Sequence, residues 1–134
     1  ITREYRKGSS VVSTANVGDE LTVHIMVRTV SKQGTVHDVA LVDLLPSGFE
    51  IDRESARTSL PTQGTPSLTP EFVDLREDRA LIFASISSST ASYAYKVKVT
   101  APGSFVVPPP QAMSLYDLTL RGRGPSAQFE VSAP

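Results

Sequence analysis

The feature that most restricts the fold is a two-residue alternation of apolar and polar side chains. In ELTVHIMVRTV (residues 20–30) every odd position from 21 to 27 carries an aliphatic side chain. In SYAYKVKV (residues 92–99) two tyrosines and two valines share one face, while Lys96 and Lys98 occupy the other. Side chains of a β-strand point alternately to opposite faces, so both segments predict strands with one buried face.

Further strands are predicted by apolar runs between turn residues. No segment repeats apolar residues with helical spacing over three turns, and ten prolines and eight glycines interrupt the chain. The segment REDR (76–79) is typical of a hairpin turn between two of these strands. The additional predicted strands are ITREYR (1–6), DVALVDLLP (38–46), FVDL (72–75), RALIFASIS (79–87), SFVV (104–107) and AQFEV (127–131).

Seven or eight short strands predict an all-β fold, an antiparallel β-sandwich of the immunoglobulin type. The Cys and Trp hallmarks of antibody domains are absent from the sequence. One stretch, RESARTSLPTQGTPSLTP (53–70), is polar and rich in Pro, Ser and Thr. It predicts a long loop, either functional or a mobile surface segment, with a short helical turn at residues 53–57 as a further option.

The length, the net charge and the absence of long apolar runs argue against several classes of protein. With 134 residues, the chain predicts a single domain over 1–134. A net charge of −1 argues against nucleic-acid binding, which requires a basic surplus. No apolar run approaches the roughly 18 residues of a membrane helix, so no membrane insertion by this chain is expected. Because a predicted strand begins at Ile1, without Met, we expect a fragment of a longer protein.

No set of residues predicts catalysis, a cofactor or a metal. Cysteine is absent, which excludes thiolate chemistry, and no nucleophile elbow or phosphate-binding glycine loop occurs. His24 and His37 are interpreted as polar surface residues, since a metal or catalytic site needs several converging groups. Glu77 and Asp78, beside two arginines, indicate a solvated hairpin tip. The protein is therefore predicted not to be an enzyme.

Asp43 and the arginines near the C-terminal end of the sequence need separate interpretations. Asp43 lies among apolar residues of a predicted strand, and a buried carboxylate must be paired or hydrogen-bonded. A structural role near the strand end is therefore favoured over catalysis. Arg121 and Arg123 lack interleaved aromatic residues and are weak evidence for RNA binding.

The segment FVVPPPQAMSLYDL (105–118) is a candidate contact surface. Pro108, Pro109 and Pro110 fix their φ angles, so the segment after them loses little entropy when it docks. Met113, Leu115, Tyr116 and Leu118 then predict an apolar, partly aromatic surface. The alternative is that Tyr116 packs against its own sandwich at a strand crossover.

Four segments together resemble a known family. In order they are LVDLLPSGFEI (41–51), LREDRALIFASI (75–86), YKVKVTAPGSFVVPPPQAMSLYD (95–117) and RGRGPSAQFEV (121–131). The ordered set is similar to the C-terminal macroglobulin-like (MG10) domain of bacterial alpha-2-macroglobulins, from about Val17 onward. The shared pattern, ending in A-P-G-x-F-x-x-P-P and then Y-D, is more specific than any single segment.

The resemblance implies a non-catalytic domain of a large multidomain periplasmic protein, usually lipid-anchored to the inner membrane, that traps foreign proteases after they cut a bait segment. Its expected partners are neighbouring macroglobulin and thioester domains of the same polypeptide and, through the whole molecule, target proteases. In the family a tyrosine on this loop helps shield the thioester of members that have a C-x-E-Q motif. Tyr116 matches it here, with Met113, Leu115 and Asp117 as the surrounding loop.

Two interpretations stay open. The resemblance favours a protease-trap module, whereas an immunoglobulin-like spacer or adhesion module of a secreted or surface protein fits the same strand pattern. A stand-alone hydrolase is the weakest option. The loop at 53–70 is a second candidate contact, for which a disordered surface loop is the favoured alternative.

Overall fold

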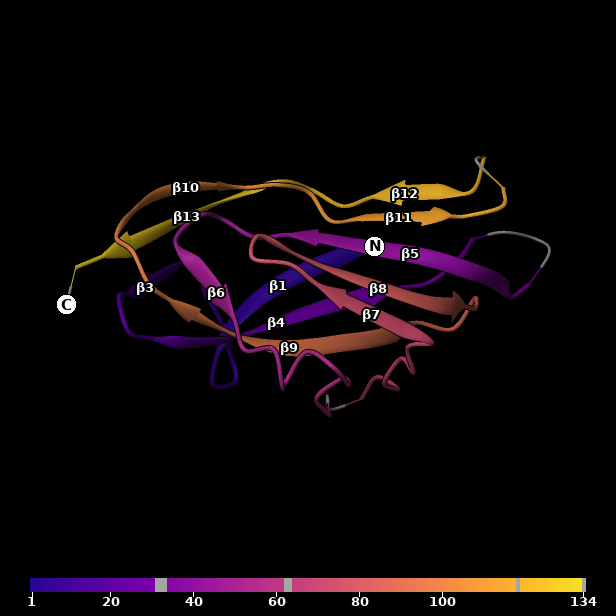
Figure 1. The fold of residues 1–134 in the computed structure, drawn as a ribbon, viewed down its shortest axis with the longest axis horizontal. Helices are drawn as coiled ribbons and strands as arrows, with labels where there is room; N and C mark the ends of the chain where they lie inside the picture. Colours follow the sequence, from indigo (N-terminus) through magenta and orange to yellow (C-terminus); the bar gives the residue numbers. More distant parts are fainter. Residues whose placement is uncertain (31–33, 62–63, 118, 134) are drawn as a thin grey trace.

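The computed structural model describes residues 1–30, 34–61, 64–117 and 119–133 (Figure 1). Within these residues it contains thirteen strands and no helix, which confirms the all-β prediction. The strands are β1 (Thr2–Lys7), β2 (Ser10–Val11), β3 (Thr14–Asn16), β4 (Glu20–Val27), β5 (Val36–Leu44), β6 (Phe49–Ile51), β7 (Phe72–Leu75), β8 (Arg79–Ile86), β9 (Ala91–Val99), β10 (Gly103–Val107), β11 (Gln111–Ser114), β12 (Arg121–Arg123) and β13 (Ala127–Ser132).

Three sheets form the sandwich. One has the order β2-β1-β4-β9-β6, the second β12-β11-β5-β8-β7, and a smaller third sheet β10-β13-β3. All pairings are antiparallel except β13 with β3. The core takes side chains from all three, for example Tyr93 from β9, Ile82 from β8 and Phe129 from β13, so the sheets pack face to face.

The alternating pattern explains the two central strands. Leu21, Val23, Ile25 and Val27 of β4 are buried, and so are the two tyrosines and two valines predicted to face inward from β9. β4 and β9 pair along their whole shared length, from Glu20 opposite Lys98 to Val27 opposite Ala91. Burial of these apolar side chains is the main stabilising term, at about 25 cal/mol per Å² of apolar surface.

The strand number exceeds the predicted seven or eight because five strands that were not predicted, β2, β3, β6, β11 and β12, have only two to four residues each. Such short pieces carry too few side chains for a visible alternation. The predicted strands all occur, and β7 and β8 form the expected hairpin, with Leu75 opposite Ala80. At residues 53–57 the chain makes hydrogen-bonded turns, not a helix.

One long hairpin is interrupted at the same level on both strands. β10 and β13 end with Val107 opposite Ala127, and β11 and β12 resume with Gln111 opposite Arg123. Residues 108–110 therefore face residues 124–126 in an unchanged register. Figure 1 shows β10 and β13 at one end of the molecule and β11 and β12 at the other. The prolines lack N–H groups, so the ladder cannot continue through them.

The predicted loop at 53–70 exists and covers the edge of β9. No described residue between Ile51 and Phe72 belongs to a strand, although Ser67 makes an isolated bridge to Ser92. The Ser55 and Ser59 hydroxyls accept hydrogen bonds from the N–H groups of Lys96 and Ala94, at 2.9 and 3.0 Å. These hydroxyls satisfy backbone donors that β6, pairing only with residues 97–99, leaves free.

Other contacts hold the same loop down. Leu60 N–H donates to Ala94 O at 2.9 Å, and Leu68 N–H donates to Ser92 O at 2.7 Å. Ala56 is fully buried, and its carbonyl accepts a hydrogen bond from the Tyr93 hydroxyl. The described part of the loop therefore lies at the surface, as the sequence predicts, and its hydrogen bonds to β9 make it a structural cover for a sheet edge.

We expect Ser59→Ala to lower the free energy of unfolding by about 1–3 kcal/mol, because it leaves the buried Ala94 N–H without an acceptor. Urea unfolding followed by circular dichroism measures the change. Thr58→Ala is the matched control, since Thr58 is exposed, and we expect a change within about 0.5 kcal/mol. Equal losses in the two variants would contradict the edge-cover role.

Candidate functional site

The end of β11 and the turn that follows it present three large apolar side chains to solvent. Tyr116 is 84% exposed, Leu115 48% and Met113 36%. Tyr116 therefore does not pack into its own sandwich, which was the alternative interpretation. Asp117 lies beside it and is partly exposed, and Leu118 lies outside the described residues. We call residues 113–117 the hairpin tip.

Hydrogen bonds fix the backbone of this tip. The Ser114 hydroxyl, which is buried, accepts hydrogen bonds from the N–H groups of Tyr116 at 3.4 Å and Asp117 at 3.2 Å. The Asp117 carboxylate accepts two more from Thr119, at 2.6 Å from its hydroxyl and 3.1 Å from its N–H. These bonds lower the pKa of Asp117. Local bonds of this kind are typical of ordered turns.

A bulge in β5 supports the tip from the neighbouring strand. The register between β5 and β8 shifts between Val36 and Val39, and Asp38 there has a φ of 55°. Asp is one of the few residues that adopt this left-handed conformation readily. The Asp38 carbonyl accepts a hydrogen bond from Leu115 N–H at 3.0 Å. The bulge thus anchors the start of the turn that carries Tyr116.

The three prolines lie at the opposite end of β11. Pro110 is buried, and its carbonyl accepts a hydrogen bond from Gly124 N–H at 2.8 Å. A side chain at Gly124 would meet Pro110 Cγ at 2.7 Å and Ile1 O at 2.8 Å, so only glycine allows this close approach. The Pro108 carbonyl accepts a hydrogen bond from Arg3 Nη2 at 2.5 Å. The proline segment is therefore held by contacts on both sides.

Arg3 connects the proline segment to a buried carboxylate. Its Nη1 lies 2.5 Å from Asp43 Oδ1, and the side chains of both residues are almost fully buried. The Tyr95 hydroxyl donates a hydrogen bond to the other carboxylate oxygen. Arg3 and Tyr95 belong to the sheet β2-β1-β4-β9-β6 and Asp43 to the sheet β12-β11-β5-β8-β7, so this group, which we call the core ion pair, links the two large sheets, which form the two layers of the sandwich.

Burial dominates the electrostatics of this group. It raises the pKa of Asp43, and the nearby Arg3 guanidinium followed by the Tyr95 hydroxyl opposes that rise. Burial, followed by the Asp43 charge, also raises the pKa of Tyr95. The Tyr5 hydroxyl is buried without a hydrogen-bond partner, and the Arg3 guanidinium carbon lies 5.6 Å from the centre of its ring. The group is suited to structure and not to proton transfer.

The sequence indicated the structural role of Asp43 but missed Arg3. The sequence does contain a pattern that predicts a buried Arg3. Arg3 and Tyr5 lie two residues apart on β1 and therefore face the same side. Tyr5 is an evident core residue, so the same alternation places Arg3 inside. The guanidinium was overlooked because arginine is almost never fully buried unless it is paired.

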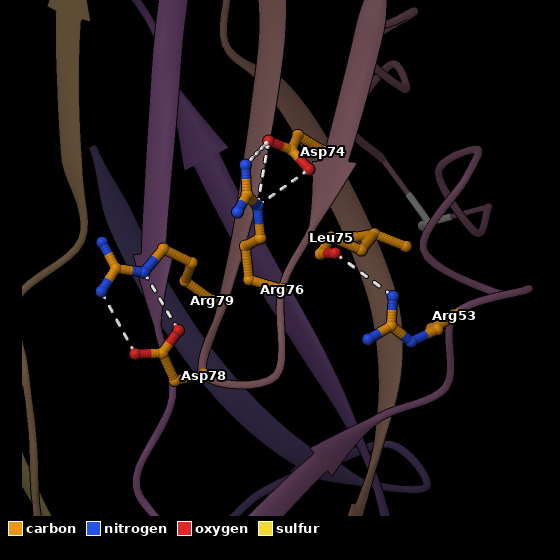
Figure 2. Close-up of polar contacts among 6 residues, drawn as sticks. All are labelled: Arg53, Asp74, Leu75, Arg76, Asp78 and Arg79. Atoms are coloured by element: carbon orange, nitrogen blue, oxygen red, sulfur yellow. Dashed lines mark hydrogen bonds and ion pairs between the residues drawn. The ribbon is translucent and has the colours of Figure 1, made fainter.

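Other charged residues form surface pairs. Arg76 turns back to Asp74 and Arg79 to Asp78 (Figure 2). Each pair is separated by 3.1 Å, and Arg53 donates a hydrogen bond to the Leu75 carbonyl at 3.2 Å. Asp78 is therefore paired with Arg79, and Glu77 beside it is exposed. His37 contacts Ser85 Oγ at 3.0 Å, and His24 is half-buried on β4. These residues keep the surface roles that the sequence indicated.

Among the described residues, no group of three or more His, Asp or Glu side chains is arranged to hold a metal ion. The same residues include no helix with the length and apolar character needed to span a membrane.

Comparison with protein families gives one match over most of the chain. Residues 1–117 match the family described as Bacterial Alpha-2-macroglobulin MG10 domain. An alpha-2-macroglobulin of Rickettsia conorii is 34% identical over 92% of this chain, and an alpha-2-macroglobulin homolog of Yersinia pestis is 32% identical over 79%. This chain spans only 7% and 6% of the lengths of these relatives.

Solved structures share the fold. Native alpha-2-macroglobulin from Escherichia coli, from domain MG7 to the C-terminus, superposes with a TM-score of 0.80 at 22% identity, covering 96% of this chain and 22% of that one. Salmonella alpha-2-macroglobulin reacted with methylamine gives 0.80 at 20% identity, covering 97% and 9%. The pilin SpaD of Corynebacterium diphtheriae gives 0.56 at 13%, covering 96% and 34%.

We expect Arg3→Met to lower the free energy of unfolding by about 3–5 kcal/mol, because it leaves the Asp43 carboxylate buried without its cation. Arg6→Met, which breaks the half-exposed pair with Glu4, is the control and is expected to cost less than about 1 kcal/mol. Urea unfolding of both variants measures the difference.

The loss in Arg3→Met depends on pH. Removing the guanidinium raises the pKa of Asp43 further in the folded state, so above about pH 4 the folded variant binds more protons than its unfolded chain. The stability of the variant then falls as pH rises. The difference in free energy of unfolding between the variant and the unchanged protein is therefore smaller at about pH 5 than at about pH 8. A difference in free energy of unfolding that is the same at both pH values would contradict the assignment of Arg3 as the partner of the Asp43 carboxylate.

Proposed function

Because this chain belongs to the bacterial alpha-2-macroglobulin MG10 domain family, we propose that it serves as one domain of a protease-trapping inhibitor. The family domain is a non-catalytic part of alpha-2-macroglobulin, and the similar structures contain it within larger multidomain chains. The proposed parent encloses a protease after that protease cuts it. The contribution of this domain is to pack against its neighbours and hold them in position.

The observation that carries this proposal is the combination of the family match with an exposed, ordered hairpin tip. Tyr116 is 84% exposed, yet the backbone on both sides of it is held by Ser114, Asp38 and Asp117. An exposed aromatic side chain on a fixed turn loses little entropy on docking and buries a large apolar area. Its proposed partner is a neighbouring domain of the same polypeptide.

For a parent that contains a thioester, the proposed contact has a specific purpose. A thioester is lost to water, and an aromatic ring laid against it excludes water while its hydroxyl stays available for hydrogen bonding. Tyr116 would provide the ring, with Met113 and Leu115 around it. Pro108–Pro110 and Asp117 would keep the tip in place. The parent is further proposed to be periplasmic and anchored to the inner membrane as a lipoprotein.

The alternative of a spacer or adhesion module has less support. The similarity to pilin SpaD shows a shared sandwich alone, at 13% identity. A spacer also gives no reason for an exposed tyrosine on an immobilised turn.

The trap is tested with the purified parent protein and a general endopeptidase such as trypsin. We expect the protease to lose activity on a large protein substrate and to keep activity on a small peptide substrate, because enclosure blocks only large molecules. Substrate size therefore separates trapping from active-site inhibition. Loss of both activities, or of neither, would contradict a trap.

Tyr116→Ala tests the contact. In a parent with a thioester we expect free thiol to appear in buffer at least about tenfold faster than in the unchanged protein, since one lost shielding side chain is worth about 1.4 kcal/mol or more. The isolated chain should unfold at the same urea concentration with and without the substitution, as the ring is exposed. Phe72→Ala, at a separate exposed aromatic residue, is the control. Equal thiol release in both variants would contradict shielding.

A further inference from the structure

An apolar pocket of about 350 Å³ opens beside the hairpin tip. It lies between the end of β4 and the hairpin formed by β11 and β12. Val27, Val30, Met113 and Leu120 are among the residues that line it. The two layers of the sandwich both contribute, so the pocket is the open end of the core at this side of the molecule.

Exposed apolar side chains gather around the same end. Seven large apolar residues are exposed in the described part of the chain, and four of them, Val30, Met113, Leu115 and Tyr116, belong to the pocket or the tip. Val30 is 84% exposed, as much as Tyr116. A grouping of this kind on one surface is typical of a contact site, whereas single exposed apolar residues are ordinary.

The charge at the pocket has one sign. Arg28 and Arg121 line it, both are exposed, and no Asp or Glu is among its described lining residues. Every Asp and Glu of the sequence lies in the described residues, and none forms an ion pair with either arginine. By contrast, Arg76 and Arg79 each fold back onto a neighbouring aspartate.

Protection of a sheet edge does not account for both arginines. Charged residues on an edge strand prevent pairing with another sheet, which explains Arg121 and Arg123 on β12. Arg28 follows β4, an interior strand of the other sheet. Two layers therefore each place an arginine without an ion-pair partner among the residues that line one apolar opening, an arrangement complementary to an acidic partner.

We propose that this pocket binds an acidic segment of the adjoining domain, which inserts one aliphatic side chain between its two arginines. The apolar walls take the aliphatic group, and Arg28 and Arg121 pair with carboxylates on either side of it. This rests on the proposed function, because it names the chemistry of the surface that faces the hairpin tip. It adds a second anchor, separate from Tyr116.

Gly122 provides a way to fill the pocket from within. It pairs with Ala112 across the hairpin, and cross-strand partners share a face. Both residues line the pocket, and a Cβ at Gly122 would meet no atom within 4 Å. The variant Gly122→Leu therefore adds an aliphatic side chain at the pocket, starting from a Cβ position that is free of contacts.

The test uses the 134-residue chain and amide chemical shifts from NMR. The probe is a blocked pentapeptide with a leucine between two pairs of acidic residues, at millimolar concentration. We expect saturable shifts at Arg28, Met113 and Arg121. Replacing the leucine by glycine should weaken binding about tenfold or more, as loss of a buried leucine side chain does. A lysine version of the peptide should not bind.

Variants of the chain test whether the peptide binds at this pocket. Gly122→Leu and Arg121→Glu should each weaken peptide binding about tenfold, for loss of the space and of one charge pair respectively. Arg123→Glu, on the same strand but outside the pocket, should change it less than about twofold. Circular dichroism confirms that each variant is folded. A peptide that does not bind, or binds all variants equally, would overturn the proposal.

Two further outcomes have distinct meanings. If the pocket amides shift with protein concentration alone, a second copy of the chain occupies this face and the proposal is overturned. If the peptide binds as expected but Tyr116→Ala does not alter the parent, the shielding function fails and the pocket stands. The tip variant is expected to leave peptide binding within about twofold, since Tyr116 does not line the pocket.

Discussion

The interaction on which the arrangement depends is the ion pair between Arg3 and Asp43 inside the sandwich. Burying two charges is expensive, and a buried pair often adds little net stability compared with apolar residues. Here the pair fixes the position of the proline segment relative to the core. The same guanidinium binds Asp43 on the opposite sheet and the carbonyl of Pro108, so the break in the long hairpin is tied to a fixed point in the core.

From that break the fixed geometry extends to the tip. The prolines stop one ladder, and β11 starts another against β5 in the second sheet. At its far end Ser114 and the bulge at Asp38 set the path of the turn. Each step removes freedom from a segment that exposes an aromatic ring to solvent. The free chain has therefore already lost the conformational entropy that docking would otherwise cost.

The alternating patterns at 20–30 and 92–99 were enough to predict the fold class, because period-two burial is a local property of the sequence. The cover formed by the loop at 53–70 was not predictable, since it depends on serine hydroxyls meeting the backbone of β9. Asp43 was recognised as needing a partner, but its partner lies forty residues away. The pocket at the tip is formed by several segments that are distant in the sequence. No local sequence pattern predicts that these segments lie together. The exposure of Tyr116 likewise required the structure.

We propose that the ordered hairpin tip contacts another domain of a larger molecule. Amide hydrogen exchange at residues 113–117, compared between the isolated chain and the intact parent, tests this most directly. We expect slow exchange at Tyr116 and Asp117 in the isolated chain, where Ser114 already holds them, and at least about tenfold slower exchange in the parent. Equal exchange rates in both molecules would show that no domain covers the tip and would contradict the account.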